Sequence, residues 1–432
     1  MQKVIIGLVG VVLIVGAFFL FSSKKIIEVK VDEQIAMLQA HGFEVNEKVQ
    51  DTNTDVKHFV VSLVDTDKFV QHFPEYKKAL EGAKKDILKK FKFGVDVTSS
   101  AATVSADIYP VSFPKETFSQ EERDIFQKLI DKKALFLKMN YNGVTKKIDG
   151  TLRDIDEKIK DIGIKVTGLN FNDISGDKID IKYNIKNLNL SSFAKDKFVV
   201  DVKDISSNMS YAGVNNQILN GFVKFDKMFF ESNNIIVNVI DTNIEIITDV
   251  KNNLFDSGIK TTIKLIDADI AKKKVELDDF IFDYGISNIN LEAFNKLVKL
   301  LDENGTNFDS PEVTTNVEKI LSNGVEIYLN KFGVDNIKYD QESLKGFSVK
   351  SKINILKDSN FLKNIQVSPM LAISAIEMKS KIEVSDELFS IIIKDPKAMM
   401  LMMFKPKDEN GHKVYDIDLK DGALNINGQP MM

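Results

Sequence analysis

The sequence contains no cysteine and almost no arginine, and both absences narrow its function. Without cysteine the chain forms no disulfide, has no thiol nucleophile and offers no thiolate to a metal ion. Of its 58 basic residues only Arg123 and Arg153 are arginines, so the planar guanidinium groups favoured for phosphate and base recognition are nearly missing. The charge is otherwise dense and balanced, at −5 overall. We therefore expect no nucleic-acid partner.

The familiar catalytic and metal-binding motifs are also missing. The sequence has no HExxH, Walker loop, GxGxxG or GxSxG. Its four histidines, His41, His58, His72 and His412, form no pair with the spacing of metal ligands. We accordingly predict no catalytic residue, no cofactor-binding residue, no metal ligand and no cofactor. The sequence favours a protein that is not an enzyme.

Two short segments match functional motifs only in part. The segment 192–195 reads S-x-x-K, as in penicillin-binding enzymes, but the companion S-D-N and K-T-G elements are absent. Asp51, Asn53 and Asp55 begin like a calcium-binding loop, yet Val56 stands where such a loop needs glycine. We interpret the first as a chance match and the second as a polar turn.

One hydrophobic run determines the expected location of the protein. Residues 4–21 are eighteen uncharged residues, of which fourteen are Val, Ile, Leu or Phe. At about 1.5 Å per residue, a helix of this length spans about 30 Å, the thickness of a bilayer's hydrocarbon core. We interpret it as a transmembrane signal-anchor, and a short tail before a single span favours export of the C-terminal body.

A cleaved signal peptide is the alternative interpretation of the same run. Val15-Gly16-Ala17 is an acceptable small-residue cleavage site. Against it, the apolar run continues through residues 18–21, beyond that site.

Helix signals follow the anchor at several points. A helical spacing from Ile27 ends at Gly42, and a helix opened by Pro74 is expected to close at Gly94. The lysines on this second helix fit either an anionic lipid surface or a solvated face. Further helices are predicted at three places, where Ser119 and Glu122 form a capping box, Asn290 caps a helix, and Ser310-Pro311 opens another. A last one starts at Ser385 and is broken near Pro396 before a methionine cluster at residues 399–403.

Alternating strand patterns dominate the remainder. Leu137, Met139 and Tyr141 alternate before an Asn142-Gly143 turn, after which Val144 is expected to begin the return strand. Short runs recur between polar linkers. They cover residues 59–64, 179–186, 198–202, 235–239, 244–247, 259–265, 275–282, 325–329 and 347–356. A hairpin around Asp421-Gly422 closes the chain.

These patterns predict an α+β, strand-rich fold, in which a transmembrane helix precedes a long curved antiparallel sheet with several helices packed on it. We divide the chain into the signal-anchor (1–23), a mixed helix and strand region near the membrane (24–160), and a strand-rich region with interrupting helices (161–432). The last two regions are expected to be continuous.

The order of these parts resembles the YdgA-like family, a bacterial envelope family built on a domain of unknown function. The resemblance depends on an N-terminal span ending in residues 23–26, a strand-rich middle, the segment 318–327 (EKILSNGVEI) and the ending 421–430 (DGALNINGQP). The ending is also similar to that of AsmA-like envelope proteins. The resemblance implies an anchor in the bacterial inner membrane, a body in the periplasm and no assigned reaction.

Two functions of different classes follow. In the first, the anchored body binds a lipid or other amphiphile on an apolar sheet face without catalysis. In the second, it is an envelope scaffold or assembly protein that self-associates without a ligand. The sequence alone leaves both open.

Overall fold

The protein is represented by a computed structural model. It describes residues 31–48, 56–72, 91–100, 102–145, 147–159, 161–172, 179–194, 197–212, 218–304, 310–339, 342–357, 361, 364, 367, 373–394 and 404–431. The predicted anchor at 4–21, most of the helix opened by Pro74, the aspartates of the calcium-like turn and the methionine cluster at 399–403 lie outside these residues.

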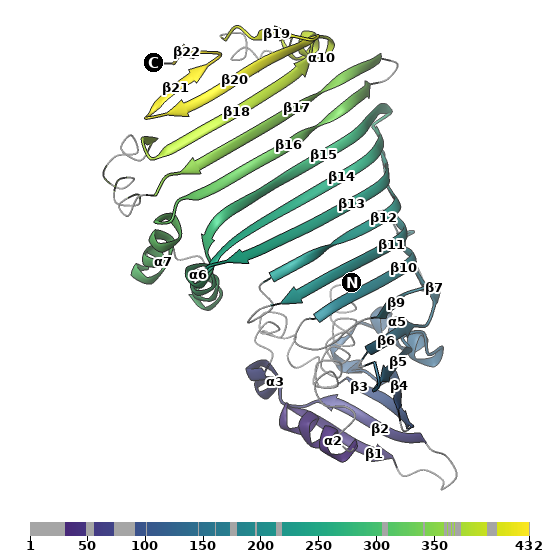
Figure 1. Cartoon of the computed structure of the whole chain (residues 1–432). Helices are drawn as coiled ribbons and strands as arrows, with labels where there is room; N and C mark the ends of the chain where they lie inside the picture. The colour runs from purple at the N-terminus through teal and green to yellow at the C-terminus, as the bar shows by residue number, and fades with distance from the viewer. Residues whose placement is uncertain are drawn as a thin grey trace. The chain divides into compact units, whose positions relative to one another are not determined.

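Contacts divide the chain into two compact units (Figure 1). Unit 1 comprises residues 1–195 and 203–210, and unit 2 comprises residues 196–202 and 211–432. Strand β11 (Phe198–Ala212) contributes residues to both units. The border predicted at residue 160 falls inside unit 1.

Unit 1 is an antiparallel sheet with short helices. Its strands are β1 (Phe43–Lys48), β2 (Val56–Leu63), β3 (Lys92–Ser99), β4 (Thr103–Ser112), β5 (Leu137–Asn142), β6 (Lys147–Leu152), β7 (Ile155–Ile159), β8 (Ile162–Thr167), β9 (Asn170–Asn172) and β10 (Ile179–Ser192). Among the described residues its helices are α2 (Val31–Ala40), α3 (Thr66–His72), α5 (Gln120–Asp131) and the 3-10 turn η3 (Lys115–Thr117). β1 to β6 pair in sequence order, β6 pairs with β9, and both β9 and β8 pair with β10.

A large phenylalanine cluster forms the core of unit 1. Phe126 of α5 lies 4.9 Å from Phe118, 5.3 Å from Phe113 and 5.8 Å from Phe91 between ring centroids. The predicted capping box starts this helix: the Ser119 hydroxyl accepts a hydrogen bond from the backbone N–H of Glu122, whose carboxylate accepts one from the N–H of Ser119. Local sequence thus places the aromatic face of α5 on the sheet.

Unit 2 is dominated by long antiparallel strands. They are β12 (Ile218–Ser232), β13 (Ile235–Lys251), β14 (Leu254–Ile270), β15 (Lys273–Asn290), β16 (Val325–Tyr339), β17 (Glu342–Ile355), β18 (Ile376–Ser385), β19 (Lys407–Glu409), β20 (His412–Lys420), β21 (Ala423–Ile426) and β22 (Gln429–Pro430). β12 to β18 pair in sequence order, β18 pairs with β20, and β20 also pairs with β19 and β21. At about 3.4 Å per residue, the 17 residues of β13 extend about 58 Å.

Among the described residues, three helices accompany the sheet of unit 2. They are α6 (Leu291–Asn304), α7 (Pro311–Leu321) and α10 (Asp386–Ile392). Their predicted starts are confirmed, because Asn290, Ser310 and Ser385 each accept a hydrogen bond from a backbone N–H three residues ahead. The antiparallel strand pairings of the two units confirm the predicted strand-rich class.

Several local predictions were wrong. Val144 does not begin a strand: Asn142 pairs with Lys147, and the Asn142 side chain accepts hydrogen bonds from the N–H groups of Val144 and Thr145, so the turn is wider than two residues. Gly94 does not close a helix but lies inside β3 opposite Tyr109. The runs at 235–239 and 244–247 belong to the single strand β13, and β12 and β18 were not predicted.

Candidate ligand-binding face

The sheet of unit 2 has one apolar and one polar face. Side chains at alternate positions of a strand share a face, and paired residues on neighbouring strands lie on the same face. We define the apolar face by the hydrophobic residues that the register aligns. They are Val237, Val239, Ile244, Ile246, Ile259, Ile263, Ile266, Ala268, Val275, Leu277, Phe280, Phe282, Tyr284, Leu329, Phe332, Val334, Ile337, Leu344, Phe347, Val349, Ile382, Tyr415 and Ile417.

On neighbouring strands of this sheet the alternation of hydrophobic residues shifts by one position. These shifts lie on a line across the sheet, which we call the line of offsets, and they keep the apolar face continuous. On each strand from β12 to β17 one hydrophobic spacing along this line is three residues instead of two, as from Val239 to Thr242 and from Leu277 to Phe280. The aspartates between them, Asp241 and Asp279, have φ of 50° and 55°. Because aspartate tolerates this left-handed conformation better than most residues, it can shift the alternation by one position.

Aromatic rings from three strands line the middle of the apolar face. Phe332 lies 6.0 Å from Phe280, 5.6 Å from Phe282 and 5.4 Å from Phe347 between ring centroids, in edge-to-face arrangements. The Tyr284 ring lies 4.6 Å from Phe282 and is 38% exposed. This aromatic strip is only partly covered.

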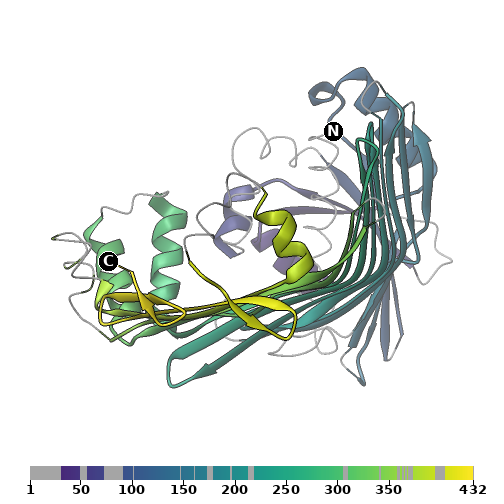
Figure 2. The ribbon, with the colours of Figure 1, turned by 90° about the horizontal axis from the view of Figure 1, so that it is seen from above.

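Among the described residues, α6, α7 and α10 cover parts of the apolar face. At one end, α6 and α7 pack over Phe255, Ile289 and Val325. Elsewhere α10 contacts β17, β18 and β20, with Phe389 6.5 Å from Tyr415. Figure 2 shows α6, α7 and α10 on the same concave side of this sheet. Most hydrophobic side chains between the helices remain partly exposed in the structure as described.

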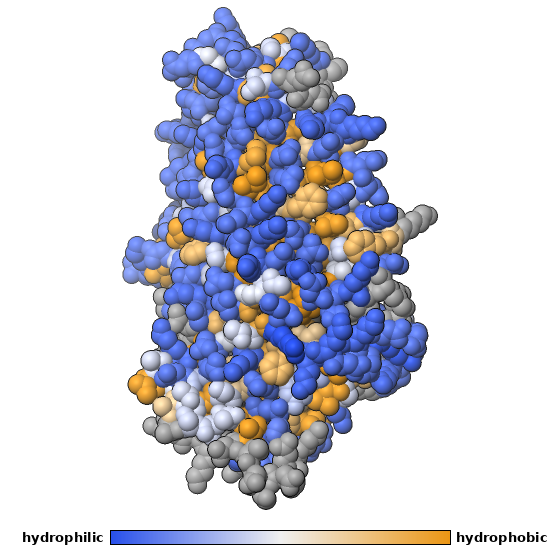
Figure 3. Space-filling model, turned by 90° about the vertical axis from the view of Figure 1, so that its right-hand side faces the viewer, coloured by the Kyte–Doolittle hydropathy of each residue, from blue (hydrophilic) through white to orange (hydrophobic). Residues whose placement is uncertain are grey.

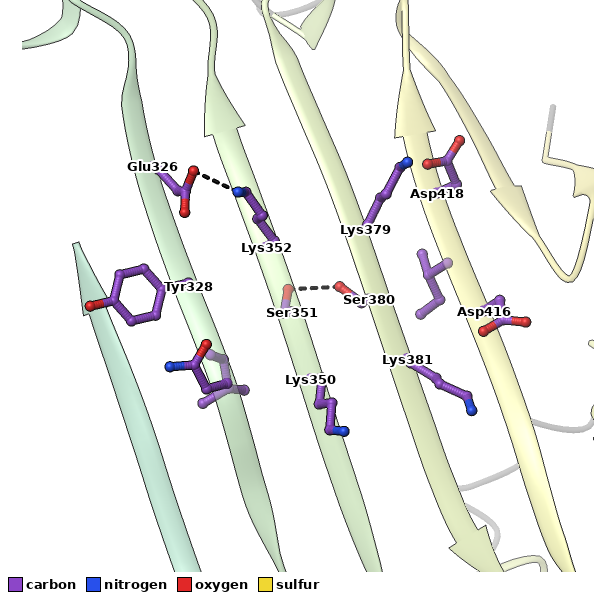
Figure 4. A pocket seen from close by; sticks show the side chains of 13 residues that line it. Glu326, Tyr328, Lys350, Ser351, Lys352, Lys379, Ser380, Lys381, Asp416 and Asp418 are labelled. Atoms are coloured by element: carbon purple, nitrogen blue, oxygen red, sulfur yellow. Dashed lines mark hydrogen bonds and ion pairs between the residues drawn. The ribbon is translucent and has the colours of Figure 1, made fainter. Parts of the chain in front are cut away.

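A hollow of about 710 Å³ lies over β16, β17, β18 and β20, and residues of both alternating sets line it (Figure 4). Thirteen residues line it, and they are Glu326, Tyr328, Leu329, Asn330, Lys350, Ser351, Lys352, Lys379, Ser380, Lys381, Asp416, Ile417 and Asp418. Lysines oppose each other across β17 and β18, and Glu326 contacts Lys352 at 2.7 Å. Acidic residues of β16 and β20 flank these lysines, and no nucleophile with an adjacent base is among the lining residues.

Tyr328 borders this hollow and lies over two glycines. A Cβ added at Gly285 would overlap its hydroxyl, and one added at Gly258 would crowd it. Burial, followed by the nearby negative charges of Asp283, Asp256 and Glu326, raises the pKa of Tyr328. The tyrosine thus stays neutral and acts as a cover for exposed backbone.

Unit 1 contains a polar cluster that the sequence analysis missed. The His58 ring nitrogen Nδ1 lies 2.7 Å from a carboxylate oxygen of Asp96, which also accepts a hydrogen bond from the Tyr109 hydroxyl at 3.1 Å. Asp96 pairs with Asp107 across β3 and β4. Burial and the two aspartates raise the pKa of Tyr109 to about 12, while burial, opposed by Lys138 and assisted by Asp96, raises that of Asp107.

This cluster does not complete a catalytic arrangement. A neutral tyrosine and a histidine with a carboxylate partner could move a proton, but no serine or threonine nucleophile contacts His58 among the described residues. Nor do the described residues hold a group of three or more His, Asp and Glu suited to a metal ion. Hydrophobic and polar residues alternate along β3 and β4, and this pattern could have identified both strands. The two strands were nevertheless not predicted.

The partial motifs are not assembled into sites. Ser192 is buried at the end of β10, and Lys195 lies outside the described residues. Of the histidines, His41 follows α2, His58 is in β2, His72 ends α3 and His412 begins β20 of unit 2.

Comparison with protein-family models, with curated proteins and with solved structures found no match. Among the helices that the structure describes, none combines the length and the hydrophobicity needed to cross a bilayer.

Proposed function

We propose that this protein is a non-catalytic binding protein that holds a lipid or another amphiphile on the apolar face of unit 2. The proposal rests on one observation: the aromatic strip and its aliphatic neighbours are only partly covered by α6, α7 and α10. Exposed apolar surfaces of this extent usually mark an interaction site. An acyl chain gains about 0.8 kcal/mol for each methylene buried there.

The proposal includes a location. Residues 4–21 anchor the protein in the bacterial inner membrane, and the body lies in the periplasm. This location agrees with the resemblance to YdgA-like proteins and with the AsmA-like ending. The membrane that holds the anchor is then also the source of the amphiphile.

A tryptophan probe tests the occupant, because the chain has no natural tryptophan. Tyr284→Trp places the probe on the apolar face, where Tyr284 is 38% exposed. Ile247→Trp places it at a site that is 64% exposed, on the opposite face. We expect a fatty acid brominated along its chain to quench the fluorescence of the first variant and leave the second nearly unchanged.

Equal quenching of both variants, or of neither, would contradict the proposal. A blue shift of the Tyr284→Trp emission that grows with protein concentration, without quenching, would instead show that a second copy covers this face. That result would favour the self-associating scaffold.

A further inference from the structure

Two neighbouring hairpin turns of unit 2 end in exposed isoleucines. The turns join β12 to β13 and β14 to β15, and Ile235 pairs with Ile270 between them. Ile235 is 39% exposed, Ile236 is 38% exposed and Ile270 is 50% exposed. Because Ile235 and Ile236 are consecutive in a strand, one exposed isoleucine lies on each face of the sheet at this point. Figure 3, viewed from the side to which these turns point, shows hydrophobic patches among hydrophilic residues.

One of these turns has an unusual sequence. Ala271 and Lys272 have φ of 53° and 70°, a left-handed conformation that favours glycine and asparagine. Other turns of unit 2 with two left-handed residues use the favoured types, as in Asn252-Asn253 and Asp421-Gly422. The chain therefore keeps an alanine and a lysine at 271–272 against the preference of the backbone, and such exceptions often mark function.

Charge at the two turns is of one sign. The row Glu231–Ile236–Asp269–Lys274 contains the last acidic residues of these hairpins. Beyond that row stand Ser232, Asn233, Asn234, Ile235, Ile270, Ala271, Lys272 and Lys273. This end, which we call the tip, therefore combines exposed isoleucines with two lysines and no acid, as membrane-surface segments do.

We infer that the tip docks on an anionic lipid surface, with Ile235 and Ile270 entering the headgroup region and Lys272 and Lys273 contacting lipid phosphates. The inference rests on the proposed function, because the apolar face starts at the tip. The row behind the tip isoleucines contains Val237, Ala268, Val275 and Tyr339, all on that face. An amphiphile leaving the membrane at the tip would pass directly onto these side chains.

A site-specific label tests docking in the full chain, since it has no natural cysteine. We would label Ile270→Cys with an environment-sensitive dye, using the protein reconstituted in phosphatidylcholine vesicles and then mixed with vesicles rich in phosphatidylglycerol. We expect a blue shift and protection from an aqueous quencher at position 270. The matched control, Ile247→Cys on β13, should remain accessible because it lies about 40 Å along the strand from Ile235.

Two variants separate charge from backbone strain. Lys272→Glu with Lys273→Glu should weaken docking by at least about tenfold, because each lysine contributes about fivefold near an anionic surface. Ala271→Asn with Lys272→Gly should raise the thermal midpoint, since it relieves the turn, and should still weaken docking about fivefold.

A label at 270 that stays accessible to the quencher with both lipid compositions would overturn the inference. So would unchanged docking in the double glutamate variant. If Tyr284→Trp is still quenched by the brominated fatty acid in that case, the tip inference fails and the proposed function stands. If the label is protected but Tyr284→Trp is not quenched, the proposed function fails and the tip is a membrane contact alone.

Discussion

The two units achieve stability in different ways. Among the described residues, twenty-two buried hydrophobic side chains lie between Phe43 and Ile155, whereas thirteen lie between Val239 and Tyr415 of unit 2. Unit 1 packs helices and phenylalanines over a short-stranded sheet. Unit 2 instead relies on long strands, and the helices described in it do not form a complete second layer over them. The hydrophobic residues of unit 1 therefore form a core that stabilises the fold, whereas those on the apolar face of unit 2 remain partly exposed.

The largest expected difference comes from truncating one phenylalanine in each unit. Phe93→Ala, at a side chain 1% exposed, should lower the free energy of unfolding of unit 1 by about 3–5 kcal/mol. Phe282→Ala on the partly covered aromatic strip should cost unit 2 about 1–2 kcal/mol, because less of the ring is removed from water. Hydrogen exchange in urea, read separately for peptides of each unit, measures both. Equal losses would show that the apolar face is a closed core.

Glycines under tyrosine rings give the next largest effect. Gly285→Ala should destabilise unit 2 by about 2–3 kcal/mol, because the new Cβ meets both Tyr328 and the carbonyl oxygen of Ser257. Gly94→Ala should cost unit 1 about 1 kcal/mol, because its nearest neighbours are side-chain atoms of Tyr109 alone.

Second substitutions serve as the control. Tyr109→Leu should recover most of the loss caused by Gly94→Ala, since the ring is the obstacle. Tyr328→Leu should recover only part of the loss at Gly285, because the carbonyl of Ser257 remains. Equal recovery in thermal melts would contradict this account.

The third largest loss of stability is expected from substitutions at the left-handed residues of unit 2. Asp279→Val should cost about 1–2 kcal/mol, because a β-branched side chain is disfavoured at φ of 55°. Asp279→Gly should be nearly neutral. Asp278→Val is the matched control on the adjacent residue, and a change within about 0.5 kcal/mol is expected there. A large loss for Asp279→Gly would mean that the carboxylate, rather than the backbone, matters.

The smallest effect is a pH-dependent gain in unit 1. The raised pKa of Asp107 means that folding favours its protonated form, so this contribution to stability is complete below the ordinary carboxyl pKa and is lost as pH rises through the raised value. Asp107→Asn mimics the protonated form and should stabilise unit 1 by about 0.5 kcal/mol at pH 7. Melts at pH 3 and pH 7 should show the gain only at the higher pH, and a gain at both would point to another cause.

Much of the local structure could be predicted from the sequence, because caps and tight turns depend on a few neighbouring residues. The capping box at Ser119 and the hairpin at Asp421-Gly422 are examples, and both are confirmed. The full length of β13 was not predicted because Asp241 interrupts the alternation that identifies strands. In the sequence, a change in the spacing of hydrophobic residues from two to three is the same signal that marks the end of a strand.

The sequence predicts that the sheet has an apolar face, but not how much of that face is open to a ligand. Alternation in 179–186 or 275–282 indicates a sheet with one apolar side, but it does not say how much of that side helices cover. That depends on the contacts of α6, α7 and α10, which link distant segments. The cluster around Asp96 is similar, since His58 and Tyr109 come from separate strands and their meeting depends on register.

The line of offsets sets a rule for how such a sheet can grow. Asp241 lies seven residues after the turn residue Asn234, and Asp279 lies seven residues after Lys272. A hairpin copied with this spacing would join the sheet with both faces already in phase, whereas a one-residue insertion between turn and offset would turn every later side chain to the wrong face. The sheet could therefore widen by whole hairpins, and a wider sheet would extend its apolar face across the strands without changing the distance from the tip to the offset line.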